Sequence, residues 1–389
     1  MMKPQLRIGM VGYKFMGKAH SNAYRSVARF MDVPFTPVLQ AICGRDRGAV
    51  AEAAARYGWQ EYETDWRRLV ARPDIDVIDI GTPNNSHCEI ALAAARAGKH
   101  ILCEKPLAMT VAEAREMLAA VQSAGVTHML CHNYRFAPAV RLAKRLIDEG
   151  HLGQIYHFRG VYLQDWIMNP DFPLVWRLQG DIAGSGSLGD LGAHTIDLAR
   201  FLVGEFSEVV GLQETFIKER PVGGEMDGGL GAGGGGGGAR TRVTVDDATA
   251  FLARFENGAV GTFEATRFAG GNRNGNRWEI NGSKGSIRWN MEEMNWLEVY
   301  FHDDPPGLQG WRRINCTEAV HPYAGAWWPP GHIIGYEHTF VHAVYELLHG
   351  IAGQYSPAPN FEDGLRNQQV LDAVERSAAS RAWVQVERG

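Results

Sequence analysis

Along the first third of the chain, short apolar runs alternate with longer stretches in which apolar residues recur at helical spacing. The apolar runs predict strands at residues 6–11, 38–43, 76–80, 100–103 and 126–131. The stretches between them predict helices at residues 16–29, 49–57, 89–97 and 111–123. Strands joined by helices of this length form right-handed crossovers, so we expect an α/β Rossmann domain with a doubly wound parallel sheet over residues 1–133.

After about residue 133 the pattern changes to strands with alternating apolar and polar positions. These strands are predicted at residues 155–162, 251–255, 260–268, 278–280 and 286–289. The sequence Asn257-Gly258 between two of them predicts a hairpin turn. Helices are predicted at residues 139–149, 188–202, 336–349 and 363–382. Residues 134–389 are therefore expected to form an α+β domain with a large, mainly antiparallel open sheet.

A glycine-rich segment at residues 223–239 interrupts this second half and includes an unbroken glycine run at residues 233–238. Such a composition cannot bury a core, so we interpret the segment as a surface loop insertion. A lid over a functional site is the alternative.

Composition limits the classes of partner. The 389 residues suffice for about two domains, and a formal net charge of -5 argues against a nucleic-acid partner. No apolar run approaches the ~18 residues that a membrane span needs. The first residues lack an apolar signal segment, and the 5 cysteines form no close pair, which favours inert thiols in a reducing cytoplasm.

The first turn, Gly12-Tyr13-Lys14-Phe15-Met16-Gly17, lies between a predicted strand and a predicted helix. A dinucleotide-binding turn has glycine at its first, third and sixth positions, and here Lys14 replaces the third. The second strand ends at Cys43-Gly44-Arg45-Asp46. A small residue followed by arginine suits a 2′-phosphate and slightly favours NADP, whereas Asp46 keeps NAD open. The turn Thr82-Pro83-Asn84-Asn85-Ser86-His87 is either a second cofactor contact or an ordinary helix cap.

Two further motifs carry candidate chemistry. Lys105 precedes Pro106 at the end of a predicted parallel strand, and Asp190 and His194 are spaced to share one helix face with Asp197. Oxidising an alcohol by hydride transfer needs a group that accepts the hydroxyl proton and a positive charge beside the developing alkoxide. Alternatively, Lys105 is a solvated strand end and His194 a structural or metal-binding histidine; a metal is not expected, because hydride transfer requires none. Trp166, Trp176 and the pair at residues 327–328 either belong to the core or stack on a sugar ring.

With these motifs the chain resembles the glucose–fructose oxidoreductase / inositol dehydrogenase / rhizopine-catabolism (Gfo/Idh/MocA) family over nearly its whole length. The motifs that carry the resemblance are Phe15-Met16-Gly17-Lys18-Ala19-His20, Cys103-Glu104-Lys105-Pro106, Asn133-Tyr134-Arg135-Phe136 and Gly189-Asp190-Leu191-Gly192-Ala193-His194-Thr195-Ile196-Asp197. Leu163-Gln164-Asp165-Trp166 and Gly184-Ser185-Gly186-Ser187 add a finer similarity to the anhydrosugar, glycoside 3- and inositol dehydrogenases.

The resemblance implies a cytoplasmic NAD- or NADP-dependent dehydrogenase that oxidises a secondary alcohol, preferably at carbon 3, of a sugar, anhydrosugar, glycoside or inositol. It implies a homo-oligomer, dimer or tetramer, built on the open sheet. The expected catalytic residues are Lys105, Asp190 and His194. The expected cofactor contacts are Gly12, Lys14, Phe15, Met16, Gly44, Arg45, Thr82, Asn84, His87, Glu104, Lys105 and Asn133. The expected substrate contacts are Lys105, Tyr134, Arg135, Trp166, Arg177, Asp190 and His194.

Two alternatives to an ordinary dehydrogenase remain open at this point. One is a non-catalytic sugar or nucleotide sensor on the same fold. The other is a glycoside-processing enzyme that retains and recycles a tightly bound NAD.

Overall fold

The computed structural model describes residues 3–222 and 239–388. The chain forms two compact units, the first of Met1–Asn133 with Tyr336–Gln368 and the second of Tyr134–Gly335 with Gln369–Gly389. Residues 336–368 were expected in the second domain and instead pack with the first unit. The functional division into a cofactor domain (1–133) and a substrate domain (134–389) stays a prediction. The predicted insertion at residues 223–239 lies, except for its last residue, outside the described residues.

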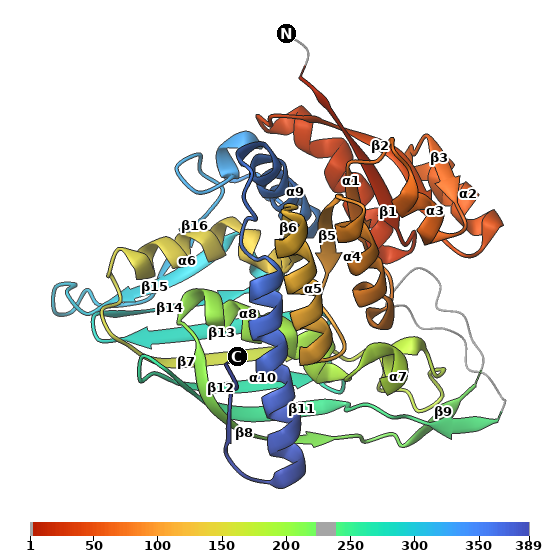
Figure 1. The fold of residues 1–389 in the computed structure, drawn as a ribbon. Coiled ribbons are helices and arrows are strands. Elements are labelled where there is room, and N and C mark those ends of the chain that lie inside the picture. The colour runs from red at the N-terminus through yellow and green to blue at the C-terminus, as the bar shows by residue number, and fades with distance from the viewer. Residues whose placement is uncertain (1–2, 223–238, 389) are drawn as a thin grey trace. The chain divides into compact units, whose positions relative to one another are not determined.

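The first unit contains a six-stranded parallel sheet in the order β3-β2-β1-β4-β5-β6 (Figure 1). Its strands are β1 (Gln5–Val11), β2 (Thr36–Cys43), β3 (Glu61–Glu63), β4 (Val77–Ile80), β5 (His100–Glu104) and β6 (His128–Cys131). The order reverses between β1 and β4, as in other doubly wound sheets, and confirms the predicted fold class of this half. The short β3 was not predicted, because its three residues carry no apolar run.

The helices of this unit are α1 (Phe15–Phe30), α2 (Arg47–Tyr57), α3 (Trp66–Ala71), α4 (His87–Arg96), α5 (Val111–Ala124) and, from the far end of the chain, α9 (Tyr336–Gly353). Helix α9 packs against α1. The main core joins strand residues to α3, α4 and α5, and Phe361 and Leu365 at the start of α10 (Phe361–Ser380) complete it. The C-terminal segment thus helps to bury the Rossmann core.

Local sequence fixes several helix ends. Thr110 and Glu113 form a capping box at the start of α5, and Gly125 ends that helix with a positive φ of 63°. Asp46 caps α2 by accepting the N–H of Ala49. Such caps satisfy backbone N–H and C=O groups that have no partner within the helix.

The second unit is built on a nine-stranded sheet in the order β16-β15-β14-β13-β7-β12-β11-β8-β17. Its strands are β7 (Ile155–Leu163), β8 (Phe206–Glu214), β11 (Ala248–Phe255), β12 (Val260–Thr266), β13 (Gly275–Gly282), β14 (Gly285–Asn290), β15 (Trp296–Phe301), β16 (Arg312–Asn315) and β17 (Val384–Gln385). A separate two-stranded sheet pairs β9 (Glu219–Pro221) with β10 (Arg240–Arg242) in antiparallel orientation. Only β7 and β12 pair in parallel among these described strands, and Gly258 (φ 88°) turns the predicted β11–β12 hairpin.

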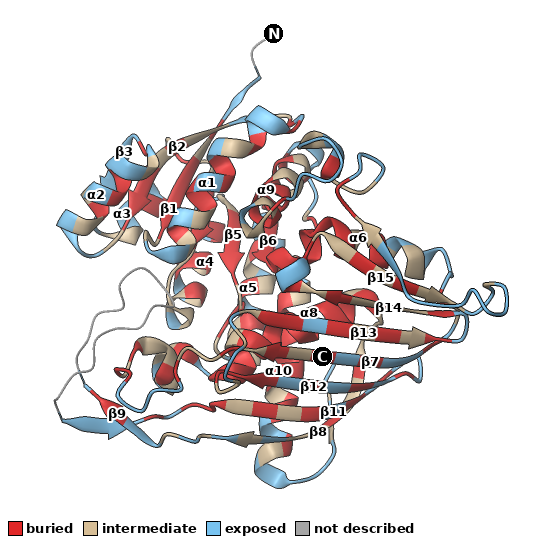
Figure 2. Ribbon diagram, turned by 180° about the vertical axis from the view of Figure 1, so that it is seen from behind, coloured by how far each residue is buried: buried red, intermediate tan, exposed pale blue. Residues whose placement is uncertain are grey.

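The helices of this unit are α6 (Pro138–Asp148), α7 (Gly180–Ala183), α8 (Ala193–Leu202) and the second half of α10. In Figure 2 the strands lie in front of α8 and α10, and buried and exposed residues alternate along several of them. The predicted helix 188–202 is continuous, but its first turn, Leu188–Gly192, is a π-helix. A π-helical turn changes the angle between residues before and after it, so Asp190 is not placed as in a regular α-helix.

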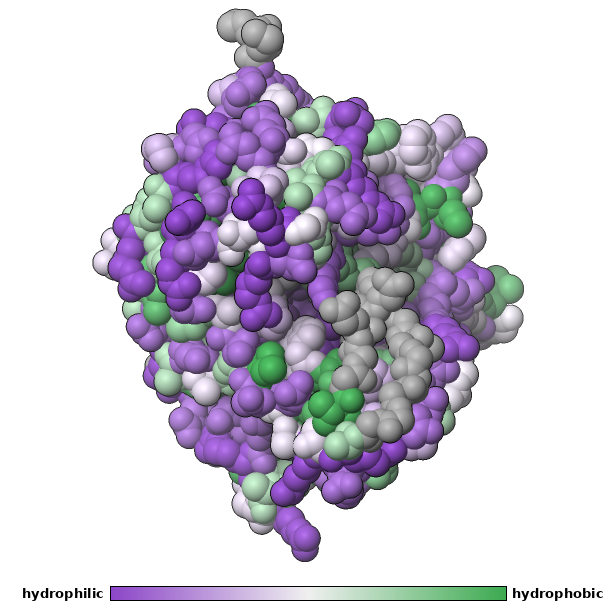
Figure 3. Space-filling model, turned by 90° about the vertical axis from the view of Figure 1, so that its right-hand side faces the viewer, coloured by the Kyte–Doolittle hydropathy of each residue, from purple (hydrophilic) through white to green (hydrophobic). Residues whose placement is uncertain are grey.

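No helix within the described residues combines the length and hydropathy needed to cross a membrane. On the side drawn in Figure 3, polar residues predominate and the hydrophobic ones form small separate groups. Large apolar side chains are exposed elsewhere on the second sheet: Leu212 on β8, Leu252 on β11 and Val260 on β12. The strand register places all three on one face, because Leu212 lies opposite Ala250 and Val260 opposite Arg254.

Candidate active site

The first βα turn is closed by glycines that admit no side chain. Gly12 has a φ of 111°, and a Cβ atom added to it would lie 2.5 Å from the carbonyl oxygen of Gly81. A Cβ atom on Gly17 would lie 2.3 Å from the carbonyl oxygen of Gly12. The first and sixth glycines of the motif are therefore required by close backbone packing, as a dinucleotide-binding turn demands.

The third position of the turn tolerates lysine. Lys14 has a negative φ of -77°, which any residue can adopt, and its side chain is exposed. No side chain caps the start of α1, and its first turn carries no acidic residue. The N–H groups there, with Lys14 beside them, form an electropositive end suited to a pyrophosphate. Phe15 is exposed and stacks on Tyr336 with ring centroids 6.3 Å apart, while Met16 is half-buried.

The Tyr13 ring lies against Gly44 at the end of β2, a contact not predicted from the sequence. A Cβ atom on Gly44 would lie 2.2 Å from ring carbons of Tyr13, so that ring occupies the space of a side chain at position 44. Asp46 accepts the N–H of Ala49 at 2.9 Å and is thereby engaged as a helix cap. Arg45 is exposed.

The turn after β4 separates into a surface part and a buried part. Thr82 and Asn84 are partly exposed, and Ser86 donates to the Thr82 hydroxyl at 2.7 Å. His87 is fully buried, with Nδ1 2.9 Å from the Pro106 carbonyl oxygen and Nε2 3.0 Å from that of Thr82. Burial lowers the pKa of His87. His87 thus bridges two loops, and its predicted contact with the cofactor stays a prediction.

Lys105 and its neighbours occupy the carboxyl ends of β5 and β6. Lys105 is partly exposed, whereas Glu104 before it is buried, with its Oε2 accepting the Lys105 N–H at 3.2 Å. Asn133 is buried, and its amide donates to Thr339 of α9 at 2.8 Å. Of these three residues, Lys105 is the one that presents a partly exposed side chain.

In the second unit, Asp190 is held by a residue that the sequence did not reveal. Nη2 of Arg267, whose side chain is 1% exposed, donates to Oδ2 of Asp190 at 2.8 Å. Arg267 follows β12 directly, and its only sequence signal is a cation inside a predicted apolar strand, residues 260–268. A buried arginine beside a carboxylate favours the ionised carboxylate and fixes its orientation.

His194 lies on α8 between two tyrosines. Its ring centroid is 4.6 Å from that of Tyr134 and 5.8 Å from that of Tyr162. Tyr162 donates to Asn274 at 2.6 Å, so the 2.8 Å contact between the two tyrosine hydroxyls is donated by Tyr134. His194 is 7% exposed and packs against the hydrogen-bonded pair of Tyr134 and Tyr162. We call these three residues the wall around His194.

The hydrogen bonds that start at Tyr134 and Tyr162 extend through Asn274 to Trp166, a predicted substrate contact. Asn274 also accepts from the Gln164 amide at 3.2 Å, and Gln164 accepts from the Trp166 indole N–H at 2.9 Å. Tyr162, Gln164 and Asn274 were not among the predicted site residues. Asn274 lies more than 100 positions from Trp166, so no local pattern connects the two, whereas Tyr162 and Gln164 lie close to Trp166 in the sequence. Trp166 and Arg177 are partly exposed.

Arg135, a predicted substrate contact, lies in a buried ion pair. Its guanidinium donates to both carboxylate oxygens of Asp197, at 2.8 and 2.7 Å, and both side chains are at most 4% exposed. Arg135 is thus engaged in a buried ion pair with Asp197, and its predicted substrate contact stays a prediction. Such bidentate pairs fix geometry, here between α8 and the segment before α6.

Comparison with known proteins accounts for both units. The model of an oxidoreductase family with an NAD-binding Rossmann fold matches residues 6–132, and that of the GFO/IDH/MocA C-terminal domain matches residues 140–288. Levoglucosan dehydrogenase of Pseudarthrobacter phenanthrenivorans is 46% identical over 383 residues, 98% of each chain. An oxidoreductase domain protein from Kribbella flavida has a TM-score of 0.94 at 52% identity, covering 99% of this chain and 100% of that chain. The structure of levoglucosan dehydrogenase with NADH and levoglucosan has a TM-score of 0.93 at 44% identity, with the same coverage.

Both family models, the full-length similarity and the glycine-closed turn of β1 agree with the resemblance drawn from the motifs. NAD is the cofactor of the matching Rossmann family, so the cofactor prediction is confirmed for NAD, while the slight preference for NADP stays a prediction. The protein is a member of the GFO/IDH/MocA family of NAD-binding oxidoreductases.

Proposed function

We propose that the protein is an NAD-dependent dehydrogenase that oxidises a secondary alcohol of an anhydrosugar or glycoside, at carbon 3 of the ring. The observation that supports this most strongly is the 46% identity to a levoglucosan dehydrogenase over 98% of both chains. Because a few loop residues decide which sugar is bound, levoglucosan is the first substrate to test and related glycosides and inositols are the next.

The first unit has the features that NAD requires. The backbone is packed so closely at Gly12 and Gly17 that neither position can carry a side chain. The start of α1, whose N–H groups have no side-chain cap, would hold the pyrophosphate. Thr82, Asn84 and Arg45, which are at least partly exposed, would contact the rest of the dinucleotide. When bound, NAD supplies the carbon that accepts a hydride from the substrate carbinol.

Three residues of this chain would handle the proton and the charge. His194 would take the hydroxyl proton, Asp190 would fix the orientation of the imidazole, and Lys105 would support the developing alkoxide. Lys105 belongs to the first compact unit and the other two residues to the second, so their juxtaposition is part of the proposal. Arg267 supports it further, because its ion pair keeps Asp190 charged and oriented.

The wall around His194 suits a sugar. Trp166 offers a flat apolar face for the C–H side of a ring, and Arg177 and Asn274 offer hydrogen-bonding groups. We further propose a homo-oligomer that covers the exposed apolar residues of the second sheet. All five cysteines are free thiols, which supports location in a reducing compartment such as the cytoplasm.

The test is a panel of sugars with NAD⁺ and NADP⁺, followed by NADH formation at 340 nm. Levoglucosan deuterated at carbon 3 should transfer its label to the cofactor and show a primary isotope effect, whereas levoglucosan deuterated at carbon 2 should not. Label transfer from carbon 2 would contradict the assignment of the oxidised carbon. Sugar binding without any reduction of added NAD⁺ would favour a sensor, and NAD that co-purifies and is reduced only within the protein would favour the recycling enzyme.

A further inference from the structure

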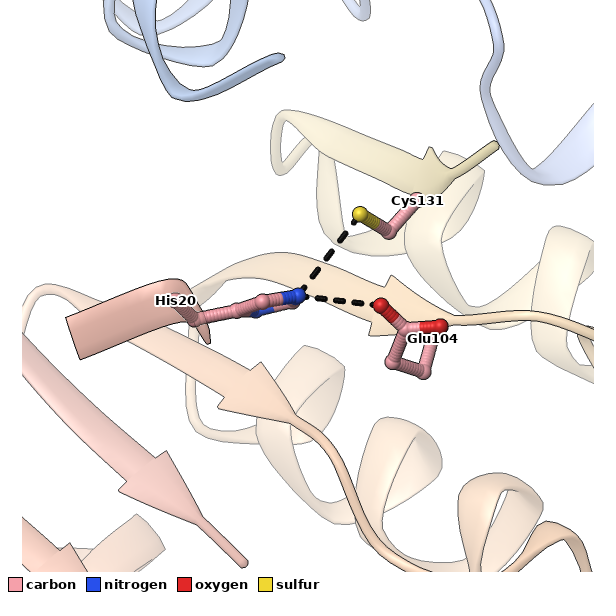
Figure 4. A group of neighbouring side chains, drawn as sticks. All are labelled: His20, Glu104 and Cys131. Carbon is pink, nitrogen blue, oxygen red and sulfur yellow. Dashed lines mark hydrogen bonds and ion pairs between the residues drawn. The ribbon is translucent and has the colours of Figure 1, made fainter. Parts of the chain in front are cut away.

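A buried cluster joins four elements of the first unit: His20 of α1, Asp79 of β4, Glu104 of β5 and Cys131 of β6. Nδ1 of His20 lies 2.9 Å from both carboxylate oxygens of Asp79, and its Nε2 lies 2.9 Å from Oε1 of Glu104. Figure 4 shows that Nε2 of the imidazole faces both the Glu104 carboxylate and the Cys131 sulfur, which lies 3.6 Å from it. His20 is thus held between two carboxylates.

The charges in the cluster follow from this geometry. Both ring nitrogens face acceptors, so both must carry a proton to form these hydrogen bonds. Burial opposes the charged ring, but Asp79 and the other neighbours outweigh it and raise the pKa of His20 well above its ordinary value. Burial also acts against ionisation of Glu104, yet its hydrogen bond to His20 lowers the pKa of that carboxyl. The His20 ring therefore lies between two buried carboxyl groups and forms hydrogen bonds with both.

The same side chains raise the possibility of a metal site, since ligand atoms of His20, Glu104 and Cys131 lie within 4.8 Å of one another. Two observations argue against it. Burial raises the pKa of the Cys131 thiol to about 12, so a metal ion would first have to displace this proton. Nε2 of His20 lies 2.9 Å from Oε1 of Glu104, and in the doubly protonated ring it has no lone pair to offer. The cluster is better suited to fixing a carboxylate.

Glu104 connects this cluster to Lys105. Its Oε1 accepts from His20, and its Oε2 accepts the backbone N–H of Lys105 at 3.2 Å. With both oxygens engaged, the carboxylate cannot rotate without breaking a hydrogen bond. We propose that His20 is a positioning residue for Lys105: by bridging Asp79 and Glu104 it fixes the carboxylate that holds the Lys105 backbone. The consequence for catalysis rests on the proposed role of Lys105, whereas the structural link does not.

The structural link can be measured without substrate or cofactor. In wild-type protein the Lys105 amide should exchange slowly with deuterium, and Pro106 contributes no amide to the same peptide. His20→Gln cannot donate to Asp79 and Glu104 in the same way, so we expect exchange at Lys105 to be at least tenfold faster, with the fold intact by circular dichroism. His128→Gln is the matched control, because it removes another buried histidine of this unit that bonds Phe361 and not Glu104.

Kinetics of the same variants test the consequence. A 1 Å displacement of a catalytic group lowers turnover by about 10²-fold. His20→Gln should therefore lower kcat about tenfold to a hundredfold while the KM for sugar and the affinity for NADH change less than about threefold. His128→Gln should keep the wild-type kcat. Should His20→Gln destabilise the fold, Glu104→Gln provides the second variant, since it keeps the side-chain shape and removes the charge paired with His20.

The outcomes separate the two proposals. Unchanged exchange at Lys105 in both His20→Gln and Glu104→Gln overturns the positioning role, even if Lys105→Met abolishes activity. Faster exchange with no dehydrogenase activity in the wild-type protein keeps the structural link and refutes the proposed function. Stoichiometric zinc in the purified protein, lost in His20→Gln, would replace the positioning role with a metal site.

Discussion

Arg267 and Asp190 form an ion pair of 2.8 Å in which the arginine side chain is 1% exposed and the aspartate 22%. The guanidinium also lies 5.4 Å from the ring centroid of Trp166. One buried cation therefore contacts a proposed catalytic carboxylate and a proposed sugar-stacking ring.

Replacing Arg267 should affect both stability and turnover. Arg267→Met leaves the Asp190 carboxylate without this partner, so we expect a loss of about 1–3 kcal/mol in unfolding free energy, limited by the partial exposure of Asp190. Turnover should fall at least tenfold. Arg220→Met is the control, because Arg220 is equally buried but donates to backbone carbonyls of Ile167, Asn169 and Phe172. Urea denaturation and kcat should separate the two variants; equal effects on kcat would contradict the assignment.

Lys105→Met and His194→Gln should each lower kcat by ~10²-fold or more, the scale of general acid–base and electrostatic contributions. The melting temperature should stay close to wild type, because Lys105 is partly exposed and glutamine retains a polar group at position 194. Steady-state kinetics with thermal denaturation checks this. Near-wild-type turnover in both variants would refute the catalytic assignments.

Two buried histidines should make the free energy of unfolding depend on pH in opposite directions, His128 at acidic pH and His20 at alkaline pH. Burial lowers the pKa of His128 from 6.5 to about 4, and its Nδ1 accepts the Phe361 N–H. The unfolded chain therefore binds this proton more readily, and stability should fall as pH drops from 6.5 to 4, by roughly 3 kcal/mol at most. The raised pKa of His20 acts the other way, so its contribution should be lost as pH rises above 6.5.

Denaturation of His128→Gln and His20→Gln between pH 4 and 9 measures these contributions. In His128→Gln the unfolding free energy should depend less on pH below 6.5 than in the wild type. In His20→Gln it should depend less on pH above 6.5. A variant curve parallel to the wild-type curve would show that the histidine in question does not titrate as described.

The exposed apolar face of the second sheet should form the oligomer interface. Leu252 is 49% exposed at the centre of that face, and Leu252→Glu should give the 43.0 kDa monomer in light scattering. Leu308→Glu is the control, because Leu308 is 76% exposed but lies in the loop between β15 and β16. A wild-type monomer at micromolar concentration would refute the interface.

Arg45→Ala should weaken NADPH binding more than NADH binding, since a charge-assisted contact with the 2′-phosphate contributes about tenfold to a hundredfold in affinity. Arg56→Ala, at the other end of α2, should change neither affinity. Calorimetry with both cofactors decides the point. An unchanged affinity ratio in Arg45→Ala would mean that this side chain points to solvent.

Sequence patterns predicted the Rossmann sheet well, because most of its strands are buried apolar runs separated by helices of similar length. The pattern was less informative where a residue's partner is far along the chain. Arg135 and Asp197 are 62 positions apart, and Arg267 and Asp190 are 77 apart. Periodicity describes neighbours on one element, so it linked Asp197 to His194 and could not reveal either arginine partner. The π-helical turn at Asp190 has no signal in the hydrophobic pattern either.

Because the Tyr13 ring lies against Gly44, the choice between NAD and NADP depends on the residues at both position 13 and position 44. An acid at position 44, the simplest way to select the ribose hydroxyls of NAD, would enter the space of the Tyr13 ring. That ring must first move or be replaced by a smaller residue. A change of cofactor specificity at position 44 therefore requires a substitution at position 13 as well. In a library that varies position 44 alone, we expect the folded, active variants to keep glycine there.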